Sequence, residues 1–257
     1  MQIDGKVVLI TGASEGIGAA CAAEFARAGG RLSLTARSEE GLRRAGGADS
    51  LITPGDITSE AVRRQVVERT LERFGAIDIL INNAGGGSYA PACTAPMEEV
   101  RRLMELNFFA LLGLTQLVLP HMRARRSGTI VNLGSIAGKM VLPWMTLYST
   151  SKYAVGALTE GLRMELRGSN VHAMVVCPGY VQTAFQQHAT GGQAPESVVR
   201  ARRFAITAEE CAAAIRRGVE RQARTVVTPR MGWLLIAAVR LLPGLVQERM
   251  ARMNGTA

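Results

Sequence analysis

The stretch that decides the fold lies near the start of the chain and reads Val7-Val8-Leu9-Ile10-Thr11-Gly12-Ala13-Ser14-Glu15-Gly16-Ile17-Gly18. Its first four residues are β-branched or aliphatic, which indicates a strand buried on both faces. Glycines follow directly, and the alanine-rich run Ala19–Ala28 then indicates a helix. Strand, glycine turn and helix in this order place backbone N–H groups where they can bind the phosphates of a dinucleotide. A glycine-rich turn that binds no ligand is the alternative.

The same alternation of strand and helix continues along the chain. Apolar runs typical of buried strands recur at 31–35, 77–82, 129–133 and 171–176, and helical patterns cover 59–74, 97–126 and 147–167. Strands alternating with helices favour an α/β fold with a doubly wound parallel sheet, the Rossmann fold. No linker-like segment divides the chain, so we expect residues 1–257 to form a single domain.

Composition and cysteine spacing limit the classes of protein to which this chain can belong. Hydrophobic residues make up 47% of the chain and the mean hydropathy is +0.12, enough for a substantial core. The cysteines lie far apart without CxxC spacing, which favours reduced thiols over a zinc site or a disulfide framework. The segment Met1–Lys6 has neither the basic region nor the cleavage site of a secretory signal. These features predict a cytoplasmic protein without a metal.

The chain is basic, and most of the surplus charge lies in its last quarter. There are 30 Lys and Arg residues against 21 Asp and Glu residues, and beyond Gly191 there are 11 arginines against 5 acids. A basic surface can bind nucleic acid, but no recognition motif or aromatic platform accompanies it here. We therefore expect no nucleic-acid partner, and assign the charge to a phosphate-bearing cofactor or an anionic membrane surface.

The end of the second predicted strand bears on the choice of cofactor. It reads Thr35-Ala36-Arg37-Ser38, with no acid before Glu39. An acid at this point would hold the ribose 2′-hydroxyl of NAD, whereas an arginine can bind a 2′-phosphate. The sequence therefore favours NADP(H) over NAD(H), although Glu15 in the glycine loop acts against this choice. For Arg37 the alternative is a solvated loop cation.

Tyr148 and Lys152 stand four residues apart, and Ser135 lies thirteen residues before the tyrosine. This spacing places tyrosine and lysine on one face of a helix. An ammonium close to a phenol lowers the phenol's pKa from about 10, so we expect Tyr148 to act as a general acid or base. A tyrosine and a lysine at this spacing also occur by chance on helix surfaces. The pair is evidence for catalysis only together with the other motifs.

Together these motifs resemble those of the short-chain dehydrogenase/reductase family over residues 5 to about 190. The resemblance rests on Thr11-Gly12-x-x-x-Gly16-Ile17-Gly18, Asn82-Asn83-Ala84-Gly85, Asn107, Ser135, Tyr148-x-x-x-Lys152 and Pro178-Gly179-x-x-x-Thr183. It implies reversible hydride transfer between NADP(H) and a ketone/secondary alcohol pair, in a homodimer or homotetramer. A catalytically silent, dinucleotide-binding regulatory protein is the alternative, against which the undamaged motifs argue.

The resemblance also implies a role for each residue of the site. Ser135 would donate a hydrogen bond to the carbonyl oxygen, and Tyr148 would protonate it. Lys152 would bind the nicotinamide ribose, and Asn107 would distort its helix and hold a water of the proton relay. Asparagine is disfavoured inside a helix, which agrees with that role.

A larger set of residues would contact the dinucleotide. Asp56 would lie at the adenine and Val181 near the nicotinamide carboxamide. Structural turns are the alternative for Asp56, for Asn82-Asn83 and for Pro178-Gly179. The full set is Gly12, Ser14, Glu15, Gly16, Ile17, Gly18, Arg37, Asp56, Ile57, Asn83, Ala84, Gly85, Tyr148, Lys152, Pro178, Gly179, Val181 and Thr183.

Two later segments bear on the substrate. Residues 184–204 are predicted to form a lid, with Gly191-Gly192 favouring mobility and His188 on its surface. Residues 229–250 contain the apolar run Met231–Val246, which is shorter than a bilayer span and interrupted by Arg240. This run can be a core helix, a contact with an anionic membrane, a substrate entrance or a subunit contact. Relatives with such tails act on lipids, so we expect a lipophilic ketone of the keto-sphingoid, keto-acyl or steroid type and a role in lipid metabolism.

Overall fold

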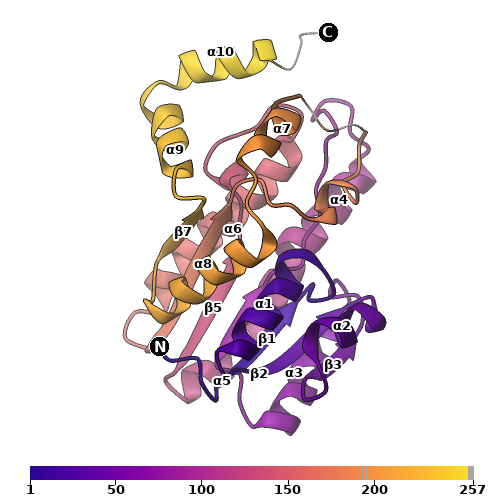
Figure 1. The fold of residues 1–257 in the computed structure, drawn as a ribbon, viewed down its shortest axis with the longest axis vertical. Helices are drawn as coiled ribbons and strands as arrows, with labels where there is room; N and C mark the ends of the chain where they lie inside the picture. Colours follow the sequence, from indigo (N-terminus) through magenta and orange to yellow (C-terminus); the bar gives the residue numbers. More distant parts are fainter. Residues whose placement is uncertain (193, 195, 254–257) are drawn as a thin grey trace.

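The computed structural model describes residues 1–192, 194 and 196–253, and its centre is one parallel sheet of seven strands (Figure 1). The strand order is β3-β2-β1-β4-β5-β6-β7, which confirms the predicted doubly wound sheet. The strands are β1 (Val7–Thr11), β2 (Arg31–Ala36), β3 (Leu51–Pro54), β4 (Ile79–Asn82), β5 (Gly128–Leu133), β6 (Val171–Pro178) and β7 (Thr225–Thr228).

Helices connect the strands and cover both faces of the sheet. The α-helices are α1 (Gly16–Arg27), α2 (Glu39–Gly46), α3 (Glu60–Phe74), α4 (Met97–Met104), α5 (Ala110–Ala124), α6 (Thr146–Glu165), α7 (Glu196–Ala201), α8 (Ala208–Glu220), α9 (Gly232–Leu241) and α10 (Pro243–Met253). Short helical turns are η1 (Glu105–Phe109), η2 (Ile136–Gly138), η3 (Ala184–Gln186) and η4 (Arg202–Phe204). The predicted lid falls on η3, α7 and η4, apart from residues 193 and 195, which lie outside the described residues.

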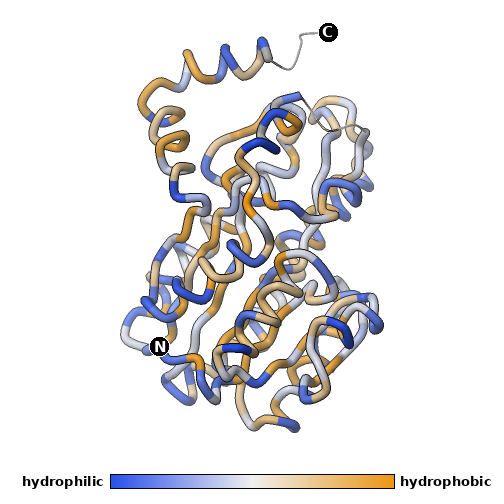
Figure 2. The backbone as a smooth tube through the Cα atoms, viewed as in Figure 1, coloured by the Kyte–Doolittle hydropathy of each residue, from blue (hydrophilic) through white to orange (hydrophobic). Residues whose placement is uncertain are grey.

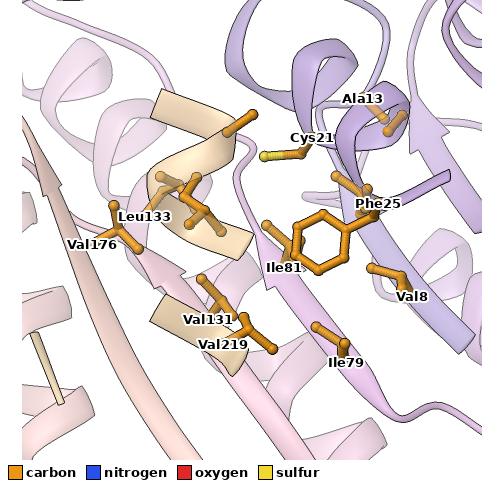
Figure 3. Packing of buried hydrophobic residues seen from close by; sticks show 14 of the residues in the cluster. Val8, Ala13, Cys21, Phe25, Ile79, Ile81, Val131, Leu133, Val176 and Val219 are labelled. Atoms are coloured by element: carbon orange, nitrogen blue, oxygen red, sulfur yellow. The ribbon is translucent and has the colours of Figure 1, made fainter. Parts of the chain in front are cut away.

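Alternating side chains of the central strands build the core on both faces of the sheet. Val8 and Ile10 pack on one face with α1 and α8, whereas Leu9 packs on the other with α3 and α5. Successive residues of a strand point to opposite faces, which accounts for this division. Figure 3 shows the cluster on the face covered by α1 and α8, which includes Phe25 of α1 and Val8 of β1. The continuous apolar runs of the sequence are therefore explained by burial on both sides.

The helical pattern at 97–126 is interrupted around Asn107, in agreement with the distortion that the resemblance implied there. It divides into α4, the π-helical turn η1 and α5. By length and composition, Met97–Ala124 is long and apolar enough to cross a bilayer. The inner face of α5, including Leu114 and Val118, is buried against the sheet and α3. Its apolar residues thus serve the core.

Helices α9 and α10 form an arm that leaves the sheet after β7 (Figure 1). Figure 2 shows hydrophobic residues along α9 and into the start of α10. Ile236 is only 2% exposed and packs on Val175, Cys177 and Val227, whereas Leu234 is 75% exposed. The expectation that this segment is a core helix holds only for the side of α9 that bears Ile236.

Candidate active site

The carboxyl ends of the strands surround a cavity of about 1600 Å³. In open parallel sheets this is the edge at which ligands bind. Nearly all the predicted site residues line it, and Gly18 and Asn107 alone among them do not. Those that do are Gly12, Ser14, Glu15, Gly16, Ile17, Arg37, Asp56, Ile57, Asn83, Ala84, Gly85, Ser135, Tyr148, Lys152, Pro178, Gly179, Val181 and Thr183.

The glycine loop between β1 and α1 is built for close backbone approach. Gly12 and Gly16 have φ values of +62° and +55°, which favour glycine. A Cβ on Gly18 would lie 2.1 Å from the Gly12 carbonyl oxygen, so only glycine fits there. The α1 N-terminus receives no side-chain cap, which leaves its N–H groups for an anion at the cavity. The loop therefore fits the pyrophosphate of a dinucleotide.

Asn83 fixes the glycine loop from the neighbouring strand end. Its side-chain Nδ2 donates to the carbonyl oxygens of Thr11 and Gly12, at 2.9 and 3.1 Å. The Thr11 hydroxyl accepts in return from the backbone N–H groups of Asn83 and Ala84, each at 3.0 Å. The Asn-Asn motif thus has a structural role, and it lies at the cavity as predicted.

The ends of β2 and β3 form the far side of the cavity. Arg37 is exposed and makes no ion pair within the part of the chain that the structure describes. Asp56 accepts hydrogen bonds from the backbone N–H and the hydroxyl of Thr58, both at 2.9 Å, so it also acts as a turn residue. A cation at the end of β2 is available to an anionic ligand, whereas Asp56 is already partly engaged.

Tyr148 and Lys152 lie on the buried face of α6 and are 7% and 5% exposed. The Lys152 Nζ donates to the Leu133 carbonyl oxygen at 2.9 Å and lies 5.8 Å from the centroid of the Tyr148 ring. Burial raises the pKa of Tyr148 to about 12, and hydrogen bonding with Ser135 offsets only part of this rise. Burial likewise lowers the pKa of Lys152 to about 8.

The prediction that Lys152 lowers the pKa of Tyr148 was therefore wrong. Both groups are desolvated, and desolvation disfavours the charged form of each. Helical spacing places the two residues together, as predicted, but it does not reveal how deeply they are buried. Tyr148 consequently keeps its proton at neutral pH.

Ser135 caps the short helix η2 beside Tyr148. Its Oγ accepts a hydrogen bond from the Ala137 backbone N–H at 3.1 Å. A hydroxyl that accepts one hydrogen bond can still donate its own proton, and Ser135 is also hydrogen-bonded with Tyr148. Ser135 and Tyr148 thus present two hydroxyl groups to one point of the cavity.

Asn107 lies in the π-helical turn η1 and is buried. Its Nδ2 donates to the Gly86 carbonyl oxygen at 3.0 Å and to the Ser151 Oγ at 2.9 Å, and its Oδ1 accepts from the Gly86 N–H at 2.8 Å. A Cβ on Gly85 would lie 3.1 Å from the Asn107 Oδ1 and 3.3 Å from the Lys152 Nζ. The predicted distortion of this helix is confirmed, and Asn107 lies close to Lys152.

The substrate side of the cavity contains residues that the sequence analysis did not single out. Tyr89, Met145 and Val198 are buried in one cluster with Tyr148, and Phe185 packs on the Tyr148 ring at a centroid distance of 5.8 Å. The only sequence signal for Tyr89 was its place two residues after the glycine run Gly85-Gly86-Gly87, which follows β4. These side chains make the space beside the Tyr148 hydroxyl largely apolar.

The lid and the arm close the outer side of the cavity. His188 lies on the lid surface, as predicted, and its Nδ1 is 3.2 Å from a carboxylate oxygen of Glu15 in the glycine loop. Among the described residues, five apolar side chains of the arm line the cavity: Leu234, Leu235, Leu245, Val246 and Met250. The two segments thus belong to the same site as the strand ends, although they come from the last third of the chain.

Comparisons with known proteins agree with this geometry. Residues 6–194 match the short chain dehydrogenase family. A dehydrogenase/reductase SDR family protein 7-like of Anopheles gambiae is 32% identical over 273 residues, covering 99% of this chain and 86% of the relative.

Solved structures agree as well. A short chain dehydrogenase/reductase from Burkholderia phymatum in complex with NAD has a TM-score of 0.84 and 26% identity, covering 100% of this chain and 99% of that one. A short-chain dehydrogenase from Sphingobium yanoikuyae in complex with NADPH has a TM-score of 0.78 and 30% identity, covering 98% of each. The chain belongs to the short-chain dehydrogenase/reductase family of NAD(P)-dependent oxidoreductases.

Proposed function

We propose that this protein uses NADP(H) to interconvert a hydrophobic ketone and its secondary alcohol. The observation that carries the proposal is the single cavity that joins the glycine loop, the Tyr148–Lys152 pair and an apolar wall. A silent dinucleotide-binding protein would not need Ser135 and Tyr148 to converge beside open apolar space. The bound nicotinamide would supply the hydride, and the residues of this chain would manage the proton.

In reduction, Ser135 donates a hydrogen bond to the carbonyl oxygen and Tyr148 transfers its proton to that oxygen. A pKa of about 12 keeps Tyr148 protonated at neutral pH, so its proton is available for transfer to the more basic alkoxide oxygen. We assign Lys152 to binding the ribose hydroxyls of the cofactor, since its Nζ lies buried beside Tyr148 and donates to the Leu133 carbonyl oxygen. We assign Asn107 to the link between Lys152 and solvent, supported by its position beside Gly85.

The preference for NADP(H) rests on Arg37. Its side chain lines the cavity at the end of β2, where a 2′-phosphate would lie, and it has no carboxylate partner among the described residues. A guanidinium in this place can bind a phosphate through two parallel hydrogen bonds. We therefore expect NADPH to be used more efficiently than NADH.

The hydrophobic substrate rests on the composition of the cavity wall. The cavity is also lined by the charged side chains of Arg200 and Arg203, but much of its wall is apolar. The apolar lining includes Leu142, Met145, Phe185, Val198, Leu234 and Leu245. Each methylene group buried there contributes about 0.8 kcal/mol. In a series of methyl ketones of increasing chain length, NADPH oxidation should show kcat/KM rising with length. A flat series, or activity confined to small polar ketones, would contradict the proposal.

We further propose that the arm contacts an anionic membrane surface. Seven of the fifteen large hydrophobic side chains that are exposed among the described residues lie between Met231 and Leu245. Over 230–253 the charged residues are Arg230, Arg240, Arg249, Arg252 and Glu248. Exposed apolar helices with arginines are typical of peripheral contact with anionic lipid. Such a contact would open the cavity towards the source of a lipophilic substrate.

Vesicle sedimentation tests the membrane contact. Binding should be stronger to vesicles containing phosphatidylserine than to pure phosphatidylcholine, should weaken with salt, and should fall in Leu234→Ser/Leu245→Ser. Absence of binding, together with a dimer or tetramer that the double variant breaks apart, would assign the surface to subunit contact instead. In either case we expect the protein to be a homo-oligomer.

A further inference from the structure

The hydroxyl of Tyr89 is a buried polar group without a partner. Tyr89 is 4% exposed and lines the cavity, and its hydroxyl makes no hydrogen bond within the described part of the chain. Most buried polar groups are hydrogen-bonded, so an exception at a binding cavity points to a ligand. The mechanism above gives this hydroxyl no task.

The backbone around Tyr89 is fixed, so the hydroxyl has a defined place. The Tyr89 N–H donates to the Thr190 carbonyl oxygen at 2.8 Å, and the Thr190 N–H donates to the Gly87 carbonyl oxygen at 3.1 Å. Ser88 and Thr190 form a parallel bridge between the loop after β4 and the lid. A donor held from both sides is suited to recognition, because little conformational entropy is lost when it binds.

The surroundings of Tyr89 restrict the group that it can bind. Tyr89 belongs to the same buried cluster as Tyr148, Met145 and Val198, so both hydroxyls face the substrate side of the cavity. Burial raises the pKa of Tyr89, which keeps it a hydrogen-bond donor over the physiological range. The charged side chain of Arg202 also acts on Tyr89, but the side chains packed in the cluster are mainly apolar, and such surroundings favour a neutral acceptor such as an ester carbonyl.

We propose that Tyr89 donates a hydrogen bond to a second, uncharged oxygen of the substrate, a few bonds from the carbonyl that Tyr148 protonates. The inference rests on the proposed reduction of a ketone and narrows its substrate class. The preferred substrate is a ketone with a neighbouring ester, thioester or hydroxyl oxygen on an apolar chain. A simple ketone of equal length would leave the Tyr89 hydroxyl unpaired.

Two probes of equal skeleton test this proposal: ethyl butyrylacetate, which has the second oxygen, and pentyl propyl ketone, which lacks it. In Tyr89→Phe, kcat/KM for the keto ester should fall by roughly tenfold or more, while that for the ketone changes less than about twofold. Tyr153→Phe, at an exposed tyrosine of α6, is the matched control and should change neither. An equal loss on both probes, or no loss on either, would overturn the proposal.

Thermal unfolding separates a structural role of Tyr89 from substrate recognition. Calorimetric binding separates failure of the Tyr89 assignment from failure of the proposed activity. Since the Tyr89 hydroxyl has no hydrogen-bond partner among the described residues, Tyr89→Phe should unfold at the wild-type temperature or above it, whereas a structural role would lower that temperature. If the wild type turns over neither probe, the proposed activity fails, and calorimetric binding of the keto ester still tests Tyr89. Weaker binding by Tyr89→Phe than by wild type supports the assignment; equal affinity, or no binding by wild type, refutes it.

Discussion

The inner and outer walls of the one cavity are held in place very differently. On the inner wall, formed by the strand ends and α6, the polar side chains of Lys152 and Asn83 are each tied to backbone carbonyl oxygens. On the outer wall the arm exposes leucines and is anchored mainly through Ile236. The difference indicates that the residues proposed for the chemistry belong to the rigid part of the molecule, whereas the entrance to the cavity is formed by a part with few contacts.

The largest effect is expected on the inner wall. Replacing Tyr148 by Phe removes the proton donor and should lower kcat by about 10²–10⁴-fold, since general acid catalysis contributes about that much. Dinucleotide affinity, measured by NADPH fluorescence titration, should change little because the phenol is remote from the phosphates. Tyr153→Phe, on the same helix but exposed, should keep wild-type kcat. A Tyr148→Phe enzyme with more than roughly a tenth of the wild-type rate would refute the assignment.

The second prediction tests whether Ile236 anchors the arm of the outer wall to the sheet. Ile236→Ala should lower the free energy of unfolding by about 2–4 kcal/mol, because it leaves a cavity beside Val175, Cys177 and Val227. Leu234→Ala, two residues away and exposed, should change it by less than about 0.5 kcal/mol. Urea unfolding of the two variants measures the contrast. Equal losses would mean that the whole arm is packed as core.

The third prediction concerns the cofactor end of the inner wall. Arg37→Asp should lower the ratio of kcat/KM for NADPH over NADH by about 10–100-fold, since one charge-assisted contact is lost and a repulsive charge is gained. Arg64→Asp, an exposed arginine of α3 outside the cavity, should leave the ratio unchanged. An unaltered ratio in Arg37→Asp would show that the 2′-phosphate is recognised elsewhere.

The smallest effect is a pH dependence of stability caused by burial of Lys152. Its pKa is about 8 in the folded protein and about 10.4 when unfolded, so between these values the unfolded chain binds more protons. Stability from this residue therefore rises with pH across that window, and at neutral pH the buried ammonium is destabilising by roughly 1–3 kcal/mol. Lys152→Met should raise the unfolding temperature at pH 7, and the gain should shrink towards pH 10. A gain independent of pH would contradict this account.

The inner wall could be predicted from the sequence because its signals are local. Strand and glycine loop adjoin in residues 7–18, and helical spacing alone places Tyr148 beside Lys152. The strands β3 and β7 were not predicted because they are the partly buried edge strands and each contains only two aliphatic residues. The equally short strand β4 is fully buried and gives a longer apolar run. The pKa of Tyr148 was predicted in the wrong direction, and Tyr89 was missed, because burial depends on packing between segments far apart in the chain.

The anchoring of the arm through Ile236 has a practical consequence for engineering. A library confined to the exposed positions of α9 and the start of α10 would vary the entrance while leaving the proton-transfer machinery and the nucleotide cradle untouched. Such variants should fold almost as well as the parent, so screening effort would go into selectivity rather than into rescuing damaged scaffolds.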